Sequence, residues 1–221
     1  NSGLGHGMYP QHSDVSADIT LENNISFNNF GYGFHCYGNP QLNRFVIQKN
    51  TAFHNGSQRN TPERNLLLGG YTGVNTATIA DNRFFHQMAN AENFRIGWGT
   101  GNMVSNATVT GNYSVGAQTG AYLVDCDTPT VTGNTFLGNA LKLVAGVQSS
   151  FADDFPNNIY GTSSDWTDTV FLEPNAYDES RAHLTIYNKT EANTVTVDVS
   201  RLWASGTVVA RNVQDYYTDT Q

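Results

Sequence analysis

The octapeptide "VTGNYSVG" at residues 109–116 returns as "VTGNTFLG" at residues 131–138, sharing its first four residues and its last. Reduced to an apolar residue, two variable residues, Asn, two variable residues and an apolar residue, the phrase occurs five times. Its asparagines are Asn24, Asn50, Asn82, Asn112 and Asn134. They are separated by 26, 32, 30 and 22 residues. Repeats of this length are typical of solenoids.

The residues around each Asn indicate which kind of solenoid this is. Runs such as "DITLEN" (18–23) and "ATVTGN" (107–112) alternate apolar and polar residues and are rich in Thr, Val and Ile, which predicts β-strands. A second apolar run follows each phrase, as in "GFHCYG" (33–38), so each coil is expected to hold at least two strands. Because neighbouring strands lie about 4.8 Å apart, the Asn of each coil is predicted to hydrogen-bond to the next in a buried ladder.

This pattern resembles the right-handed parallel β-helix proteins of the pectate-lyase-like superfamily. The resemblance covers residues 1–147 and rests on the five Asn phrases with their paired apolar runs. It implies an all-β fold with a right-handed parallel β-helix over this range. It also implies an extracellular protein, secreted or on the cell surface, because members mostly bind or cleave extracellular polysaccharides. Other members are tailspikes, adhesins and scaffold proteins.

The second half of the chain has a different pattern. Residues 148–167 are expected to form a connecting segment, and residues 168–221 an antiparallel β-sheet module. Its predicted strands are residues 169–174, 183–188, 194–199 and 207–213. The module resembles the small C-terminal β-sandwich modules of carbohydrate-active enzymes, but it is too short for a full sandwich. Its apolar face must therefore be covered by the β-helix flank, by missing chain or by a neighbouring copy.

Composition and motifs restrict the function. The net charge is −8 and basic runs are absent, which argues against a nucleic-acid partner. The longest apolar run is far too short to span a membrane. No Walker, zinc-binding, HExxH or GxSxG motif occurs, so neither a cofactor nor a metal is expected. The first residues, "NSGLGHGMYP", look like the second strand of a coil, so the first coil is expected to begin in mid-repeat.

The two cysteines are predicted to be unpaired. Cys36 and Cys126 occupy similar positions in coils three rungs apart, or roughly 14 Å at the strand spacing. A disulfide needs Cα atoms within about 7 Å of each other. His54 and His86 also share one place in their coils and are expected to form a solvent-facing column.

The second strand of each coil is expected to build one exterior face. The inward residues are predicted to be Phe34, Cys36, Leu66, Leu68, Phe94, Ile96, Tyr122 and Val124. The outward residues are predicted to be Tyr9, His35, Tyr37, Leu67, Arg95, Leu123 and Asp125, with Trp98 near the edge. Tyr9 is placed beside His35 because "GHGMYPQ" aligns with "GYGFHCY".

This face suggests three interpretations. In the first, an acidic polysaccharide binds to Tyr9, Arg95, Trp98 and Asp125, with rings stacking on sugars and the guanidinium pairing with a uronate. In the second, the protein is a polysaccharide lyase in which His35 or Tyr37 is the base that removes the proton α to the uronate carboxyl, and Arg95 neutralises that carboxyl. In the third, the face is ordinary solvent-exposed surface.

A hypothesis of a different class is a structural or assembly protein. Its open first coil and incomplete sheet would join neighbouring copies, because natural proteins seldom leave sheet edges bare. The sequence therefore leaves open an enzyme, a polysaccharide-binding protein and a self-associating scaffold.

Overall fold

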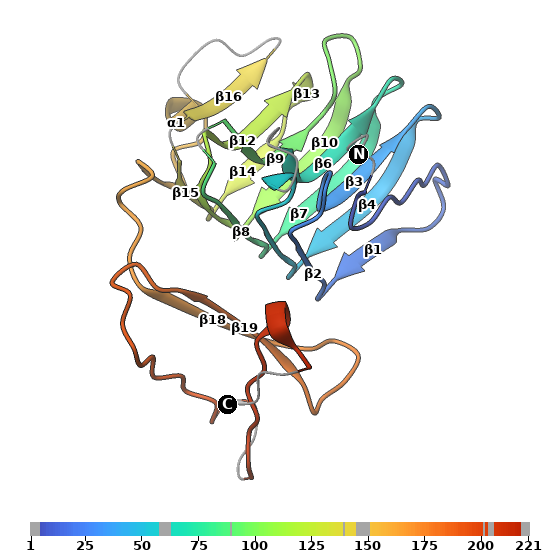
Figure 1. Ribbon diagram of the computed structural model, residues 1–221. Helices are drawn as coiled ribbons and strands as arrows, with labels where there is room; N and C mark the ends of the chain where they lie inside the picture. Colours follow the sequence, from blue (N-terminus) through green and yellow to red (C-terminus); the bar gives the residue numbers. More distant parts are fainter. Residues whose placement is uncertain are drawn as a thin grey trace.

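The computed structural model describes residues 5–57, 63–88, 90–138, 140–144 (backbone only), 151–200, 202 and 206–217. The chain folds into a parallel β-solenoid followed by a small antiparallel hairpin (Figure 1). In Figure 1 the solenoid strands form a stack, and the hairpin with the C-terminal residues lies below it.

Each coil contributes a strand to each of three parallel sheets. Sheet 1 consists of β1 (Ile19–Glu22), β4 (Leu42–Gln48), β7 (Val74–Ala80) and β10 (Val104–Thr110), the last pairing with both β13 (Cys126–Asp127) and β14 (Thr130–Thr132). Sheet 2 consists of β2 (Ile25–Phe27), β5 (Thr51–Phe53), β8 (Arg83–His86), β11 (Tyr113–Gly116), β15 (Thr135–Leu137) and β17 (Ile159–Gly161). Sheet 3 consists of β3 (Phe34–Gly38), β6 (Arg64–Gly70), β9 (Glu92–Ile96), β12 (Thr119–Val124) and β16 (Ala140–Val144).

The strand register reproduces the repeat lengths of the sequence. Leu21 lies beside Ile47, Ile47 beside Ile79, Ile79 beside Val109 and Val109 beside Val131. These are the apolar residues that open the five Asn phrases, so each phrase is one rung of the solenoid. A rung packs only against its neighbours, which is why the phrase must be repeated so closely.

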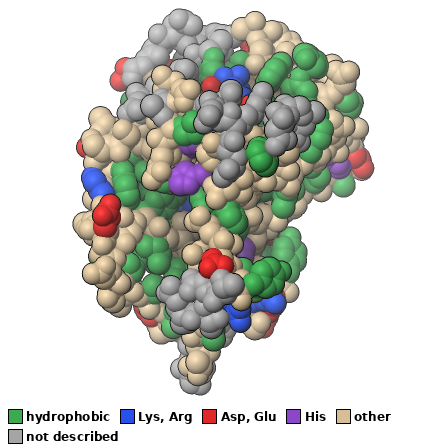
Figure 2. Space-filling view, in the orientation of Figure 1, with side chains coloured by type: hydrophobic (Ala, Val, Ile, Leu, Met, Phe, Trp, Pro, Cys, Tyr) green, Lys and Arg blue, Asp and Glu red, His purple; other side chains and the backbone are tan. Residues whose placement is uncertain are grey.

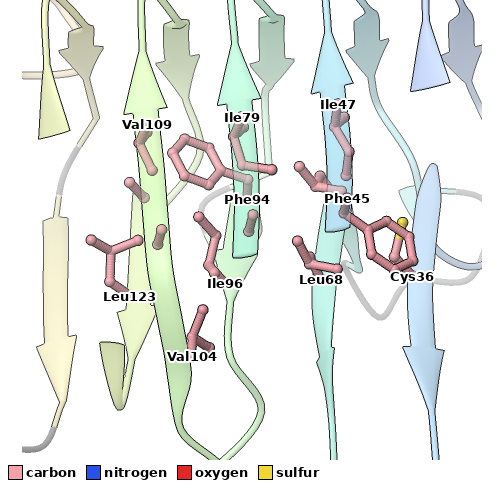
Figure 3. Close-up of a cluster of buried hydrophobic side chains, with 14 of the residues drawn as sticks. Cys36, Phe45, Ile47, Leu68, Ile79, Phe94, Ile96, Val104, Val109 and Leu123 are labelled. Carbon is pink, nitrogen blue, oxygen red and sulfur yellow. The ribbon is translucent and has the colours of Figure 1, made fainter. Parts of the chain in front are cut away.

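The core lies inside the three sheets (Figure 3). Of the residues predicted to point inward, those of β3, β6 and β9 are fully buried there: Phe34, Cys36, Leu66, Leu68, Phe94 and Ile96. Cys36 and Cys126 are unpaired, as predicted. Packed aliphatic and aromatic side chains therefore fill the interior of the coils.

The predicted orientation of β12 is wrong. Tyr122 lies beside the outward Arg95, whereas Leu123 lies beside the inward Ile96. Leu123 belongs to the core, and Figure 3 shows it among the core side chains. The cause is the run "AYLV" at 121–124, in which four successive apolar residues leave no alternation to fix the phase. A shift of one residue exchanges the two faces of a strand.

The predicted asparagine ladder is present at the corner between sheets 1 and 2, and we call it ladder 1. Each amide nitrogen donates to the Oδ1 of the next Asn at 2.8–3.0 Å, from Asn24 through Asn50, Asn82, Asn112 and Asn134 to Asn158. The four interior members of the predicted five are at most 1% exposed, and Asn24 at the outer coil is half-buried. Asn158 and β17 lie in the expected connecting segment, so the ladder and sheet 2 continue past residue 147.

A second ladder, which the sequence did not reveal, lies at the corner between sheets 2 and 3. We call it ladder 2. Amide nitrogens donate in turn from Asn29 to Asn55, Asn65 and Asn93, and finally to the hydroxyl of Ser114, at 2.8–3.0 Å. Asn55 and Asn65 belong to the same coil and are only ten residues apart. Both corners of sheet 2 are therefore held by buried side-chain amides.

A short helix covers the last coil. In α1 (Phe151–Asp154), Phe151 is buried and its ring lies 5.8 Å from that of Phe136. Phe155 packs on Phe151, and the amide of Asn158 donates to the carbonyl of Phe155 at 2.8 Å. The final core residues and the final ladder amide thus have partners at this end. No helix among the described residues is long and apolar enough to cross a membrane.

The C-terminal module is a two-stranded hairpin. Strands β18 (Thr169–Pro174) and β19 (Ala182–Tyr187) pair antiparallel, as predicted for the first two segments. The prediction is wrong for residues 194–199 and 207–213, which are not strands. An alternating pattern becomes a strand only where a neighbour satisfies its backbone groups, and neither segment pairs with the hairpin.

The flank of the solenoid covers one face of the hairpin. Tyr187 is 5% exposed and packs with Val115 and Leu137 of sheet 2. Arg83 of β8 pairs with Glu173 at 2.9 Å, and its guanidinium lies 4.1 Å from the centre of the Phe171 ring. One of the three proposed covers, the β-helix flank, therefore accounts for this face.

Candidate functional site

Aromatic side chains gather on the outward surface of sheet 3 at the first coils. We call this surface the aromatic face, and it comprises Tyr9, Tyr32, His35, Tyr37, Tyr71 and Trp98. His35 and Tyr37 alternate with the buried Phe34 and Cys36 on β3, so both point outward. Tyr9 reaches the face because Met8 bridges to Phe34, which puts Tyr9 beside His35 as the sequence alignment predicts.

The rings form a continuous line. His35 stacks on Tyr9, Tyr32 and Tyr37 with ring centres 4.8, 4.2 and 5.3 Å apart. Tyr37 then contacts Tyr71 and Trp98 edge to face at 5.6 and 5.1 Å. The inner rings are partly covered by one another, whereas Tyr9 is 52% and Tyr71 58% exposed. The rings of Tyr9 and Tyr71 are therefore exposed to solvent, and the half-buried rings between them hold them in place.

Two glycines allow Trp98 to join this line. Gly69 lies beside Tyr37 in the register, and a Cβ added to it would be 2.9 Å from the Gly97 carbonyl carbon. Gly97 has a φ of 89°, where a side chain is strained, and a Cβ there would be 2.1 Å from the Val124 oxygen. Side chains at these positions would push apart the backbones that hold Trp98 near Tyr37.

His35 on the face and His6 next to it are uncharged near neutral pH. Burial, with smaller contributions from His6 and Arg64, lowers the pKa of His35 to about 4. The His6 ring lies 4.3 Å from that of His35, and burial also lowers the pKa of His6. His6 Nδ1 accepts a hydrogen bond from the Tyr32 backbone amide at 3.1 Å. The centre of the face is therefore neutral.

The charged groups beside the face bind one another. Arg95 donates two hydrogen bonds to Glu92, at 2.9 and 2.7 Å, and Arg64 also pairs with Glu92. Burial opposes ionisation of Glu92, but its hydrogen bonds and charge interactions with Arg95 and Arg64 outweigh burial and lower its pKa. The Arg95 guanidinium also lies 4.4 Å from the centre of the Tyr122 ring. Both cations are thus engaged within the protein.

Other candidate residues do not join the aromatic face. Asp125 lies at the bend after β12, and its Oδ2 accepts a hydrogen bond from the Gly101 backbone amide at 2.7 Å. It therefore holds the turn near residue 101. Leu67 follows the outward column between His35 and Arg95, but it is fully buried. The exterior face predicted from the second strands is therefore not solvent-exposed at Leu67, between His35 and Arg95.

The structure adds residues that sequence reasoning did not select. Tyr32 and Tyr71 lie outside the strands, where a period of two gives no information. Glu92 and Arg64 are at the starts of their strands, and their register pairing brings them together. The sequence held no positional signal for these four residues, because none of them follows the alternation of a predicted strand.

The expected solvent-facing histidine column is wrong for His86, which is fully buried. Its Nε2 lies 2.9 Å from the Asn55 carbonyl oxygen, and its Nδ1 accepts from the Met88 amide at 3.2 Å. His54 is half-buried next to it, with ring centres 5.9 Å apart. Across the part of the chain that the structure describes, no group of three His, Cys, Asp or Glu residues could hold a metal ion.

Comparison with protein-family models, with curated proteins and with solved structures gave no match.

Proposed function

We propose that this protein binds an extracellular polysaccharide along the aromatic face. The observation that carries the proposal is the line of rings ending in the exposed Tyr9 and Tyr71. Aromatic side chains with an apolar body and a polar tip are suited to sugars, which have apolar C–H faces and hydroxyl edges. Exposed aromatic clusters are also uncommon on protein surfaces without a partner.

The resemblance to the pectate-lyase-like β-helix superfamily supports the same proposal. Members of that superfamily mostly act on extracellular polymers, and the parallel solenoid with its asparagine ladder agrees with the resemblance at the level of fold. We also propose that the protein is a member of this superfamily and that it is secreted.

The proposal is binding, without a cleavage step. A lyase needs a base beside a cation that is available to a uronate, and Arg95 is already paired with Glu92. Tyr37 is a poor base because burial and a hydrogen bond with Tyr71 raise its pKa. His35 is neutral at pH 7, but a pKa of about 4 makes it a weak base.

Binding is tested by affinity electrophoresis of the whole chain through gels that contain soluble polysaccharides. The parent protein should be retarded by at least one polymer. Tyr9→Ala and Tyr71→Ala should each reduce the retardation, since both rings are open and their removal leaves the core intact. Tyr177→Ala is the matched control, because Tyr177 is 75% exposed but lies between β18 and β19. Equal retardation of all four proteins would exclude the aromatic face as the site.

A second candidate function is self-association through the hairpin. Its outer face carries Val170, Leu184 and Ile186, which are 37%, 39% and 42% exposed. Val170 lies beside Ile186 in the register, so these side chains form one apolar patch without a charge. A second copy of the chain would bury such a patch, as in an assembly protein.

Self-association is tested by light scattering over a range of protein concentrations. The parent should form dimers or larger species, and Leu184→Lys should shift it to the monomer by burying a charge at the contact. Thr196→Lys, at an exposed position outside the hairpin, is the control. A parent that stays monomeric at every concentration would exclude this function.

A further inference from the structure

The charge state of the aromatic face indicates which class of polysaccharide it can take. This step rests on the proposed function and goes beyond it, because binding to rings alone does not distinguish a neutral polymer from a uronate polymer. The distinction depends on whether a cation is available to a sugar carboxylate. A desolvated carboxylate without a cationic partner is costly to bury.

Among the described residues, the two guanidinium groups beside the face, those of Arg64 and Arg95, are not available. Arg95 uses both Nε and a terminal nitrogen on the two carboxylate oxygens of Glu92, the geometry that a uronate would otherwise require. Arg64 pairs with the same carboxylate and also donates to the Tyr32 hydroxyl at 3.0 Å. Displacing either guanidinium would leave Glu92, whose side chain is 13% exposed, with a buried charge and fewer partners.

The remaining groups of the face are uncharged. Apart from His35 the face consists of Tyr and Trp rings, and burial lowers the pKa of His35 and of the adjacent His6, which keeps both imidazoles neutral. The protein as a whole carries a net charge of −8, so a polyanion meets repulsion at long range. Among the described residues on the side drawn in Figure 2, the Lys and Arg side chains stand in small separate groups.

We infer that the ligand of the aromatic face is an uncharged polysaccharide, recognised by the exposed rings of Tyr9 and Tyr71 and by hydroxyl contacts at its edges. The Arg64–Glu92–Arg95 network supports the face from beside it and does not neutralise a ligand carboxylate. The sequence analysis favoured an acidic polymer because the pairing of Arg95 with Glu92 could not be predicted from the sequence.

The experiment compares two polymer classes at two salt concentrations. Titration calorimetry with the whole chain uses soluble neutral probes (a mixed-linkage β-glucan, a galactomannan and an arabinoxylan) and acidic probes (polygalacturonate and alginate). A neutral probe should bind with a Kd that changes less than twofold between 0.05 and 0.5 M NaCl, because no charge pair is screened. The acidic probes should bind at least tenfold more weakly at both salt concentrations.

Variants connect this result to the face. Tyr9→Ala and Tyr71→Ala should each weaken binding of the neutral probe about tenfold or more, while Tyr177→Ala leaves it unchanged. Circular dichroism checks that each variant is folded, and the two exposed tyrosines provide independent tests. Loss of neutral-probe binding in both variants supports the inference.

The failures of the inference and of the proposed function are distinguishable. If only polygalacturonate or alginate binds, with an affinity that falls at high salt and is lost in Arg95→Gln, the protein binds polysaccharides but the inference is overturned. If no polymer of either class binds, the proposed function fails together with the inference.

Discussion

Ladder 1 and ladder 2 both place hydrogen-bonded side-chain amides at a buried corner of sheet 2, but only ladder 1 could be predicted from the sequence. Ladder 1 places one Asn in each coil, and a strand of sheet 2 begins at the residue directly after each Asn. Ladder 2 places two asparagines in one coil and ends on Ser114. Equivalent hydrogen bonds can therefore form with or without a repeated sequence motif. A repeat locates the amides of ladder 1, but the absence of a repeat does not exclude a ladder such as ladder 2.

The largest effect is expected at the centre of ladder 1. Asn82 donates to Asn112 and to the Ile47 carbonyl, and its Oδ1 accepts two bonds from Asn50. Asn82→Ala leaves these groups unsatisfied in a dry site, so the free energy of unfolding should fall by about 3 kcal/mol. Urea denaturation measures it, with the exposed Asn193→Ala as control. A loss below about 0.5 kcal/mol would mean that the ladder contributes little.

A smaller effect is expected at the end of ladder 2. Asn93 is fully buried; its amide donates to Ser114 and to the Val115 carbonyl, and among the described residues its Oδ1 accepts one bond, from Asn65. Asn93→Ala should lower the free energy of unfolding by about 2 kcal/mol. The same urea titration gives the value. A larger loss than for Asn82→Ala would reverse the ranking of the two corners.

The outer end of ladder 1 should tolerate the same change. Asn24 is half-buried and accepts no hydrogen bond from another ladder Asn among the described residues. Asn24→Ala should therefore cost about 1 kcal/mol or less, because water replaces the lost partners. Comparison with Asn82→Ala in one denaturation series isolates the effect of burial.

The smallest effect is a difference in acid sensitivity between the corners. Burial lowers the pKa of His86, which bonds to the Asn55 carbonyl beside ladder 2. In the unfolded chain a His titrates near about 6.5. Because the folded form takes up its proton only at lower pH, the contribution of His86 to stability is fully present above about pH 6.5 and is lost as the pH falls below it. Hydrogen exchange should show earlier loss of protection at Asn55 than at Asn82, and His86→Gln should reduce that difference.

Regular repetition made most of the solenoid predictable. The Asn phrase located ladder 1 and the strand register, since each phrase is one rung. The alternation of β3 gave the outward positions of His35 and Tyr37. Where alternation was missing, in the apolar run of β12, the orientation was wrong.

The parts that could not be predicted depend on contacts between segments without a common period. Glu92 and Arg95 are three residues apart, a spacing that places side chains on opposite faces of a regular strand, so their pairing was not expected. Tyr71 reaches Tyr37 from a turn. Residues 194–199 and 207–213 have the pattern of strands, but pattern alone does not supply a neighbouring strand.

The direction of the ladder hydrogen bonds makes the solenoid electrically polar. Along ladder 1 each amide donates one hydrogen bond to the Oδ1 of the Asn in the next coil, so the amide dipoles add in one direction, much as peptide dipoles do along a helix. The first coil is the negative end of this column and the last coil is the positive end. At the positive end the amide of Asn158 donates to Phe155 and Tyr160, which terminates ladder 1 within the chain. Within the described part of the chain, the last donor of the ladder 1 column is therefore satisfied by the turn that follows it and does not point to solvent.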